Sequence, residues 1–260
     1  MYFLHNIIIK SKKVVFLHHN KIEENKMEKE EKKYCYRYPH PAVTTDCVIF
    51  GFDGTNLKVL LVKRGVEPYA DCWALPGGFL KEDETIEECA ARELLEETNL
   101  KTELLQQFGV FSKPDRDPRE RVMTVAFLAL VKYVSTIKGG DDAREARWFD
   151  IDALPELAFD HKDIFRAAIL QLQRIIHFEP IGFELLDPKF SMPQLQKLYE
   201  AILGVNFDRR NFQRKMLGIG ILIPLKEKAA RGPHRTASLF SFDKGKYDLL
   251  KTNGNFRIEF

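Results

Sequence analysis

The chain has few cysteines, no long apolar run and almost no net charge, and each of these shortages excludes a class of protein. The 4 cysteines form no Cys-x-x-Cys pair and have no histidine at zinc-finger spacing, so neither a disulfide framework nor a zinc site is indicated. No run approaches the roughly 18 apolar residues of a membrane helix. A formal charge of +2 provides no global field toward nucleic acid or a membrane. We therefore expect a cytoplasmic protein without a membrane partner.

The composition is that of a globular protein with one large domain or two ordinary ones. Hydrophobic residues make up 45% and charged residues 30% of the 260 positions. Residues 1–38 differ from the rest, because they lack glycine and end near the charged run 28–33. Two interpretations of this N-terminal extension stay open: a translated leader upstream of a true start at Met27, or a disordered or docking arm. We expect a first domain over residues 39–155 and a second over 156–260.

The first domain shows a mixed order of strand and helix patterns. Two β-rich runs, 42–52 and 57–63, flank an Asp-Gly turn and predict a hairpin. A helix is expected from Thr85 to about Glu97. Further strands are expected at 104–111, 122–133 and 143–149, and an amphipathic helix at 160–177.

The segment from Glu82 to Glu97 contains eight acidic residues and one basic residue, Arg92. On a helix, Glu93 and Glu97 share the azimuth of Ala90, which should face the core. Two carboxylates one turn apart on a packed face repel each other and lose hydration unless a cation compensates. Oxygen ligands on adjacent turns suit Mg²⁺, so the pattern predicts a metal site rather than a solvated helix face.

The residues around this helix follow a known pattern. Gly78 is followed by five residues, Glu84, seven residues, and then the run Arg-Glu-Leu-x-Glu-Glu-x-Asn-Leu over 92–100. This spacing resembles the Nudix box, GX5EX7REUXEEXGU with U apolar, at every fixed position except the last glycine, which is Asn99 here. Because that position ends the helix in left-handed backbone, asparagine is the next-best residue after glycine.

The resemblance implies hydrolysis of a nucleoside diphosphate linked to another moiety, with Mg²⁺ or Mn²⁺ as the cofactor. Glu93 and Glu97 would be direct metal ligands and Glu96 a further one, while Glu84 and Arg92 would support them. The glycine pair at 77–78 permits a close backbone approach to a phosphate or metal. Its members, Gly77 and Gly78, are therefore expected at the substrate, and the Gly77 carbonyl near the metal.

Two other segments are candidates to complete the site. A late carboxylate often completes a Nudix metal site, and Asp141 or Asp142 has the right place before the last strand; a solvated turn is the alternative. The loop 112–121 is basic and contains two prolines. Arginine suits bidentate phosphate contacts, so its candidates to hold the diphosphate or the terminal ribose are Arg116, Arg119 and Arg121. An ordinary surface loop is the other interpretation. Similar loops occur in Nudix proteins that handle ADP-ribose, which makes ADP-ribose the expected ligand.

The C-terminal part concentrates positive charge. A capping box of Ser191 and Gln194 begins a helix with an apolar stripe, which Gly204 closes. Between residues 208 and 235, eight Lys and Arg residues stand against two acidic residues. We expect a second, basic helix after residue 208, with Phe212 and Met216 inward. An apolar strand at 219–225, a basic excursion at 226–235 and a returning strand at 236–242 should follow.

This order is the layout of a winged helix-turn-helix, in which the basic helix enters the major groove and the hairpin tip contacts phosphate. The candidate DNA-binding residues are Arg209, Arg210, Asn211, Arg214, Lys215, Lys228 and Arg231. A solvated basic face and a protein-docking module are the alternatives.

From Tyr38 onward the arrangement resembles the Nudix-related transcriptional regulators. The resemblance implies an α+β chain: a Nudix α/β/α sandwich with a mixed sheet, followed by a C-terminal winged helix-turn-helix domain. It also implies sensing of ADP-ribose or another sugar-linked metabolite, control of genes of NAD or sugar metabolism, and binding of a homodimer to palindromic double-stranded operator DNA. Because the box keeps its acidic residues, we expect retained hydrolysis. A catalytically silent sensor and a housekeeping hydrolase with a protein-docking tail are the alternatives.

Overall fold

The computed structural model describes residues 37–137, 143–230, 236–252 and 258. The expectations for residues 1–36, for Asp141 and Asp142 and for Arg231 therefore lie outside the described residues. Within the described part, no helix combines the length and apolarity that crossing a membrane requires.

The first part of the chain forms a mixed sheet. Its strands are β1 (Ala42–Phe52), β2 (Leu57–Arg64), β3 (Trp73–Ala74), β4 (Gly77–Phe79), β5 (Leu104–Phe111), β6 (Val122–Leu130) and β7 (Ala143–Asp150). The main strand order is β3-β2-β1-β6-β5, with β4 paired to β1 and β7 to β2. Since β1 and β6 are parallel and the other pairs are antiparallel, the sheet is mixed, as predicted.

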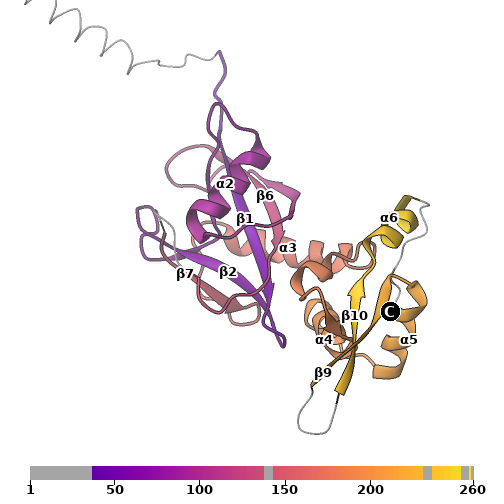
Figure 1. The fold of residues 1–260 in the computed structure, drawn as a ribbon. Coiled ribbons are helices and arrows are strands. Elements are labelled where there is room, and N and C mark those ends of the chain that lie inside the picture. The colour runs from indigo at the N-terminus through magenta and orange to yellow at the C-terminus, as the bar shows by residue number, and fades with distance from the viewer. Residues whose placement is uncertain (1–36, 138–142, 231–235, 253–257, 259–260) are drawn as a thin grey trace, which may run out of the picture. The chain divides into compact units, whose positions relative to one another are not determined.

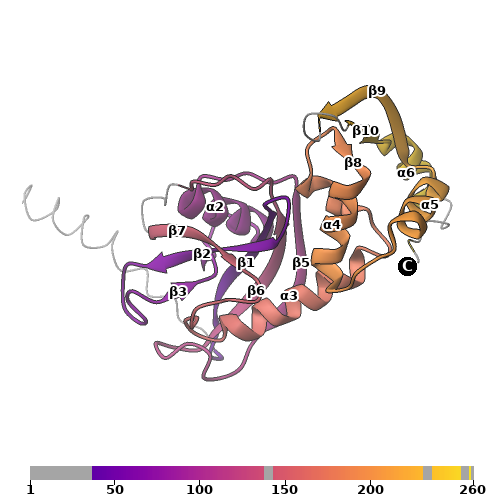
Figure 2. The ribbon, with the colours of Figure 1, turned by 90° about the horizontal axis from the view of Figure 1, so that it is seen from below.

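Helices cover both faces of this sheet. They are α2 (Ile86–Thr98) and α3 (His161–Ile175), and Figure 2 shows them on opposite faces. Alternate residues of β1 enter two different cores, because successive strand side chains point to opposite faces. Cys47 and Ile49 lie in the core that α2 covers, whereas Val48 and Phe50 lie in the core that α3 covers. The predicted α/β/α sandwich is confirmed.

The hairpin of β1 and β2 forms as its turn residues predict. The Asp53 carboxylate accepts hydrogen bonds from the amides of Thr55 and Asn56 at 2.8 and 2.7 Å. Gly54 takes a positive φ of 94°, which the turn requires and glycine adopts without strain. This hairpin lies at the centre of the sheet visible in Figure 1.

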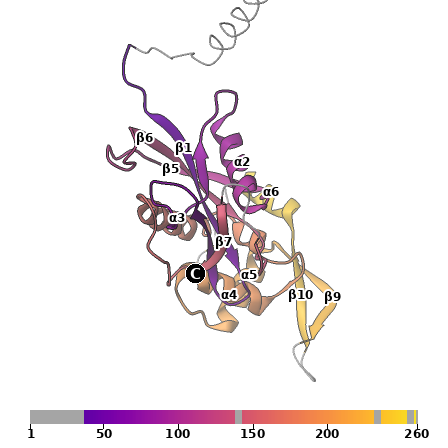
Figure 3. The ribbon, with the colours of Figure 1, turned by 90° about the vertical axis from the view of Figure 1, so that its left-hand side faces the viewer.

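Within its described residues, the C-terminal part contains three α-helices, one 3-10 helix and a three-stranded sheet. Its elements are η1 (Ile181–Leu185), β8 (Phe190–Ser191), α4 (Met192–Leu203), α5 (Arg209–Ile219), β9 (Leu222–Ala230), β10 (Thr236–Phe242) and α6 (Lys244–Thr252). The strand order is β8-β10-β9, and Figure 3 shows β9 and β10 side by side. Helix, turn, helix and hairpin confirm the predicted winged helix-turn-helix.

Three predicted boundaries were wrong. The strand expected to end at Tyr133 ends at Leu130. Ile219 ends α5 instead of starting a strand, because Gly220 adopts φ 78° and caps the helix. The strand β9 runs to Ala230, so Lys226 and Lys228 lie within the strand rather than in a basic excursion. The helix α6 has no counterpart among the predictions.

Asn99 provides a test of how α2 ends. Its backbone is left-handed, with φ 55° and ψ 19°, and its amide donates to the Leu95 carbonyl at 2.9 Å. We expect Asn99→Ala to lower the free energy of unfolding by about 1 kcal/mol, because a β-carbon is disfavoured in this conformation. Asn99→Gly should match or exceed the wild type. Urea unfolding of the three proteins measures the effect, and equal stability of Asn99→Ala and Asn99→Gly would contradict this account.

Candidate active site and nucleic-acid interface

Helix α2 begins at a complete capping box. The Thr85 hydroxyl accepts from the Glu88 amide at 3.2 Å, and the Glu88 carboxylate accepts from the Thr85 amide at 2.7 Å. The helix start is therefore set by local chemistry, and it determines which residues face the sheet.

Glu93 and Glu97 point at the glycine pair of β4. The Gly77 amide donates to the Glu97 carboxylate at 3.0 Å. A β-carbon on Gly78 would lie 2.3 Å from an oxygen of Glu93, so only glycine leaves room for that carboxylate. The two acidic side chains thus lie on the inward face of α2, as helical geometry predicts.

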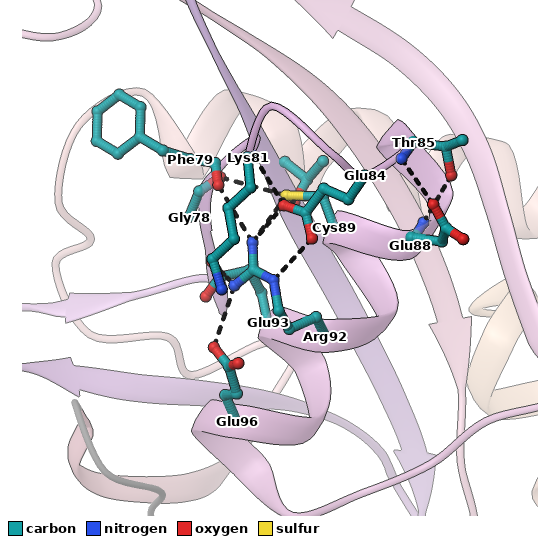
Figure 4. Close-up of polar contacts among 11 residues, drawn as sticks. Gly78, Phe79, Lys81, Glu84, Thr85, Glu88, Cys89, Arg92, Glu93 and Glu96 are labelled. Carbon is teal, nitrogen blue, oxygen red and sulfur yellow. Dashed lines mark hydrogen bonds and ion pairs between the residues drawn. The ribbon is translucent and has the colours of Figure 1, made fainter. Parts of the chain in front are cut away.

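Arg92 gathers the other acidic residues of the box, as Figure 4 shows. Its guanidinium donates two hydrogen bonds to Glu84, at 2.5 and 2.8 Å, and one to Glu93 at 2.6 Å. It also donates to Glu96 at 3.1 Å and to the Phe79 carbonyl at 3.2 Å. The hydrogen bonds from Arg92 lower the pKa of Glu84 to about 2. Arg92 therefore ties helix α2 to strand β4 and orients Glu93.

Burial makes the inward carboxylates costly. Desolvation, together with the nearby charges of Glu93 and Asp46, raises the pKa of Glu97 to about 8, although the hydrogen bond from the Gly77 amide opposes this shift. Burial also raises the pKa of Glu93 above its usual value, and the hydrogen bond from Arg92 offsets only part of this shift. Among the described residues, Arg92 pairs with Glu93 and the Gly77 amide donates to Glu97, which leaves the two carboxylates with a net negative charge that a divalent cation would balance.

The donor set fits a hard cation only in part. Glu93 and Glu97 converge, whereas the Glu96 side chain is 53% exposed and turned toward Arg92. Across the described residues, no group of three or more His, Cys, Asp or Glu residues is arranged to hold a metal. The two converging carboxylates suit Mg²⁺, which keeps several waters when few protein ligands are present.

The two carboxylates face a pocket of about 390 Å³. Its lining includes the glycine pair, Glu93 and Glu97, together with Thr44, Asp46, Arg64, Phe79, Arg116, Asp117, Arg119, Phe159 and His161. Two of the three predicted phosphate-binding arginines, Arg116 and Arg119, belong to this lining. Arg121 does not belong to it, and its guanidinium donates to the Lys113 carbonyl at 2.9 Å.

Both arginines of the lining are paired with carboxylates. Arg116 is 4% exposed and lies 3.1 Å from Asp46 and 2.8 Å from Asp160. Arg119 lies 2.7 Å from Asp117 and is 40% exposed. Arg116 therefore holds the pocket wall together, while Arg119 keeps the exposure that a ligand contact needs.

Sequence reasoning missed Asp46 and His161, which lie beside the pocket. The Leu75 amide donates to Nδ1 of His161 at 2.9 Å, and Nε2 lies 3.6 Å from Asp46. Burial lowers the pKa of His161, so the ring is neutral with its proton on Nε2. A charged residue inside the apolar run of β1 was the available signal for Asp46.

Helix α5 presents the predicted basic face. Phe212 and Met216 are buried, as expected, and the Asp208 carboxylate caps the helix by accepting from the Asn211 amide at 2.9 Å. The exposed positions include Arg209, Arg210, Asn211, Arg214 and Lys215, and Lys228 is exposed on β9. The Arg214 guanidinium donates to the Asn211 side chain at 3.0 Å, which orders part of this face.

The turn before α5 is held by side chains of α4. Gln196 donates to the Phe207 carbonyl at 2.9 Å, and Glu200 accepts from the Phe207 amide at 2.8 Å. The Phe207 ring also packs 5.4 Å from that of Phe212. These contacts fix the angle between the two helices and so the direction in which the basic face points.

The two glycines of β4 should respond differently to a β-carbon. In Gly78→Ala the methyl meets only the mobile end of Glu93, so we expect normal folding but at least tenfold weaker Mg²⁺ binding, because the carboxylate is displaced. In Gly77→Ala the methyl would lie 2.0 Å from the Thr45 carbonyl, so the protein should be strongly destabilised. Thermal unfolding with and without Mg²⁺ separates the two effects. Unchanged Mg²⁺ stabilisation of Gly78→Ala would contradict this description.

Comparisons with known proteins agree with both parts of the fold. The NUDIX domain model matches residues 40–168, and the NrtR DNA-binding winged helix domain model matches residues 182–242. The chain is 34% identical over 216 residues to the ADPR responsive transcriptional repressor NtrR of Acinetobacter baylyi, covering 82% of this chain and 86% of that protein. It is 44% identical over 140 residues to the ADP-ribose pyrophosphatase of Methanocaldococcus jannaschii, covering 54% of this chain and 80% of that protein.

A solved structure extends the likeness to the whole arrangement. The Shewanella oneidensis NrtR complexed with a 27mer DNA superposes with a TM-score of 0.68 at 28% identity, covering 83% of this chain and 97% of that one. The resemblance to the Nudix-related transcriptional regulators is thereby confirmed. The chain belongs to the Nudix superfamily and, within it, to the NrtR family, in which a Nudix domain is followed by a winged helix domain.

Proposed function

We propose that this protein is an ADP-ribose-responsive transcriptional regulator that also hydrolyses the pyrophosphate bond of ADP-ribose with Mg²⁺. The observation that carries the proposal is the convergence of Glu93 and Glu97 on the glycine pair at the pocket. The names of two relatives, an ADPR responsive repressor and an ADP-ribose pyrophosphatase, support the choice of ligand.

The residues of the box have separate tasks in this proposal. Glu93 and Glu97 would hold the cation, which would supply positive charge for the diphosphate and lower the pKa of a bound water. The Gly77 amide orients Glu97, and Arg92 orients Glu93. The ion pair with Glu84 keeps the Arg92 side chain in place. Retention of all these contacts favours hydrolysis over a site that only binds its ligand.

Glu97→Gln should abolish hydrolysis of ADP-ribose, lowering the rate by at least a hundredfold, because it removes a charge that the cation needs. Glu87→Gln, an exposed position on the same helix, is the control and should keep the wild-type rate. Product analysis of AMP and ribose 5-phosphate measures both. Full activity of Glu97→Gln would show the ligand assignment to be wrong. If the wild-type protein binds ADP-ribose tightly without turnover, the role as a regulator stands and the hydrolase activity is excluded.

The basic face of α5 is the proposed reader of operator DNA. Its residues are exposed, while the opposite face of the helix is buried, so the positive charge is directed outward. The likeness to an NrtR structure complexed with DNA supports this use of the winged helix. We infer that a homodimer presents two such helices to the half-sites of a palindrome.

Arg210→Ala and Arg214→Ala should each weaken binding to the DNA upstream of the protein's own coding sequence by about tenfold at moderate salt. A lost phosphate contact also lowers the slope of affinity against salt by about one. Lys101→Ala, an exposed cation outside the winged helix, is the control. Gel-shift or anisotropy titrations at several salt concentrations measure the effect. Equal affinity in all four proteins would exclude α5 as the DNA-binding element.

A further inference from the structure

The exposed side of α5 continues past its basic residues into an apolar last turn. Leu217 is 41% exposed, in contrast to the buried Phe212 and Met216 of the same helix. Because seven residues make almost two full turns of an α-helix, Leu217 lies on the same stripe as Arg210, and Arg214 belongs to this stripe as well. The stripe that the proposed function directs at DNA therefore ends in a large apolar side chain.

The next residue of this turn, Gly218, is not explained by the packing of the protein. It is exposed within α5 and its φ does not lie in the left-handed region, so the backbone conformation does not require glycine. A β-carbon at this position would meet no atom within 4 Å among the described residues. Glycine in a helix is less stable than alanine, because it loses more conformational freedom on folding. Gly218 therefore lowers the stability of α5, and no contact in the described part of the chain requires it.

The missing side chain opens the basic face of the helix to a close approach. Gly218 lies one turn after Arg214 and two turns after Asn211, so the gap is on the face that carries these residues. An α-helix with its side chains is about 10–12 Å across, and the major groove of DNA is about 12 Å wide. Because the fit has little clearance, a position without a side chain lets the helix lie deeper in the groove.

Positive charge lies on both sides of this turn. Arg210 and Arg214 precede it on α5, and beyond it the Lys246 ammonium lies 2.9 Å from the position that a β-carbon on Gly220 would occupy. Lys246 is exposed on α6. Cations on either side of an apolar turn match a DNA groove, which has phosphates along its edges and thymine methyl groups on its floor. The pattern of charge thus favours duplex DNA as the partner of this turn over an apolar protein surface.

We propose that the last turn of α5 belongs to the base-reading surface: the Leu217 side chain contacts a thymine methyl group in the major groove, and Gly218 leaves the room for this contact. The inference rests on the proposed function, which assigns DNA binding to the same helix. It makes Leu217 a specificity-determining residue, because the methyl group marks thymine in the major groove, whereas phosphate contacts are the same for every sequence.

Removal of the thymine methyl groups tests the contact of Leu217. The probes are two duplexes of the DNA upstream of the protein's own coding sequence, one made with thymidine and one with deoxyuridine throughout. Anisotropy titrations of the full-length protein give the ratio of the two affinities. Leu217→Ala should lower this ratio about fourfold relative to the wild type, the value expected for one buried methyl group. Leu170→Ala, which removes an apolar side chain that is 67% exposed outside the winged helix, should keep the wild-type ratio.

Two substitutions at Gly218 test the close approach. Gly218→Ala and Gly218→Leu should each raise the melting temperature by about 2 °C, because both residues form helices better than glycine does. Binding to the thymidine duplex should nevertheless weaken by about tenfold for Gly218→Ala, the size of one lost base contact, and further for Gly218→Leu. A purely structural role of Gly218 would lower stability and DNA binding together, so the opposite signs identify the contact with DNA.

The outcomes separate this inference from the proposed function. If the wild type binds the thymidine duplex and Leu217→Ala keeps the wild-type ratio, the methyl contact is wrong while DNA binding by the winged helix stands. If Gly218→Leu binds the thymidine duplex as tightly as the wild type, the close approach is wrong, and the turn faces solvent or a protein instead. If the wild type binds neither duplex, the DNA-binding part of the proposed function itself fails.

Discussion

The rest of the active site depends on two carboxylates that the fold brings out of water. Glu93 and Glu97 lie on the packed side of α2, where burial raises the pKa of both and each stands close to the glycine pair of β4. A cation bound between the two carboxylates would offset the free-energy cost of burying their charges. The absence of side chains at 77 and 78 is the complementary condition, because a β-carbon at 78 would occupy the space of the Glu93 carboxylate and one at 77 would collide with the backbone of β1.

The arginines around these two carboxylates differ in how completely they are paired with acidic residues. Arg92 is surrounded by carboxylates and serves as a rigid tie between helix and strand. Arg116 is buried between Asp46 and Asp160 and connects β1 to the start of α3. Arg64 and Arg119 stand over aromatic rings at the pocket. One residue type thus supplies internal ties deep in the site and charge at its open wall.

Local patterns predicted much of this fold. The helix start at Thr85, the capping box at Ser191, the left-handed Asn99 and the Asp-Gly hairpin turn all appear as expected, because each is decided by neighbours within a few residues. The inward side of α2 followed from helical periodicity alone. The start of β9 was missed, since a glycine at 220 within an apolar run does not reveal whether it caps a helix or begins a strand.

The sequence by itself determined the family, the acidic box and the basic helix, because these are encoded in spacing along one segment. Only the tertiary structure decided which distant side chains meet at the pocket. Asp46 and His161 are 115 positions apart in the sequence, yet the Asp46 carboxylate lies 3.6 Å from Nε2 of His161. Only the structure shows that Arg119 lines the pocket whereas Arg121 does not, and that the Glu96 side chain contacts Arg92. These choices depend on sheet register and on which carboxylate each guanidinium reaches first, and neither is a property of any single segment.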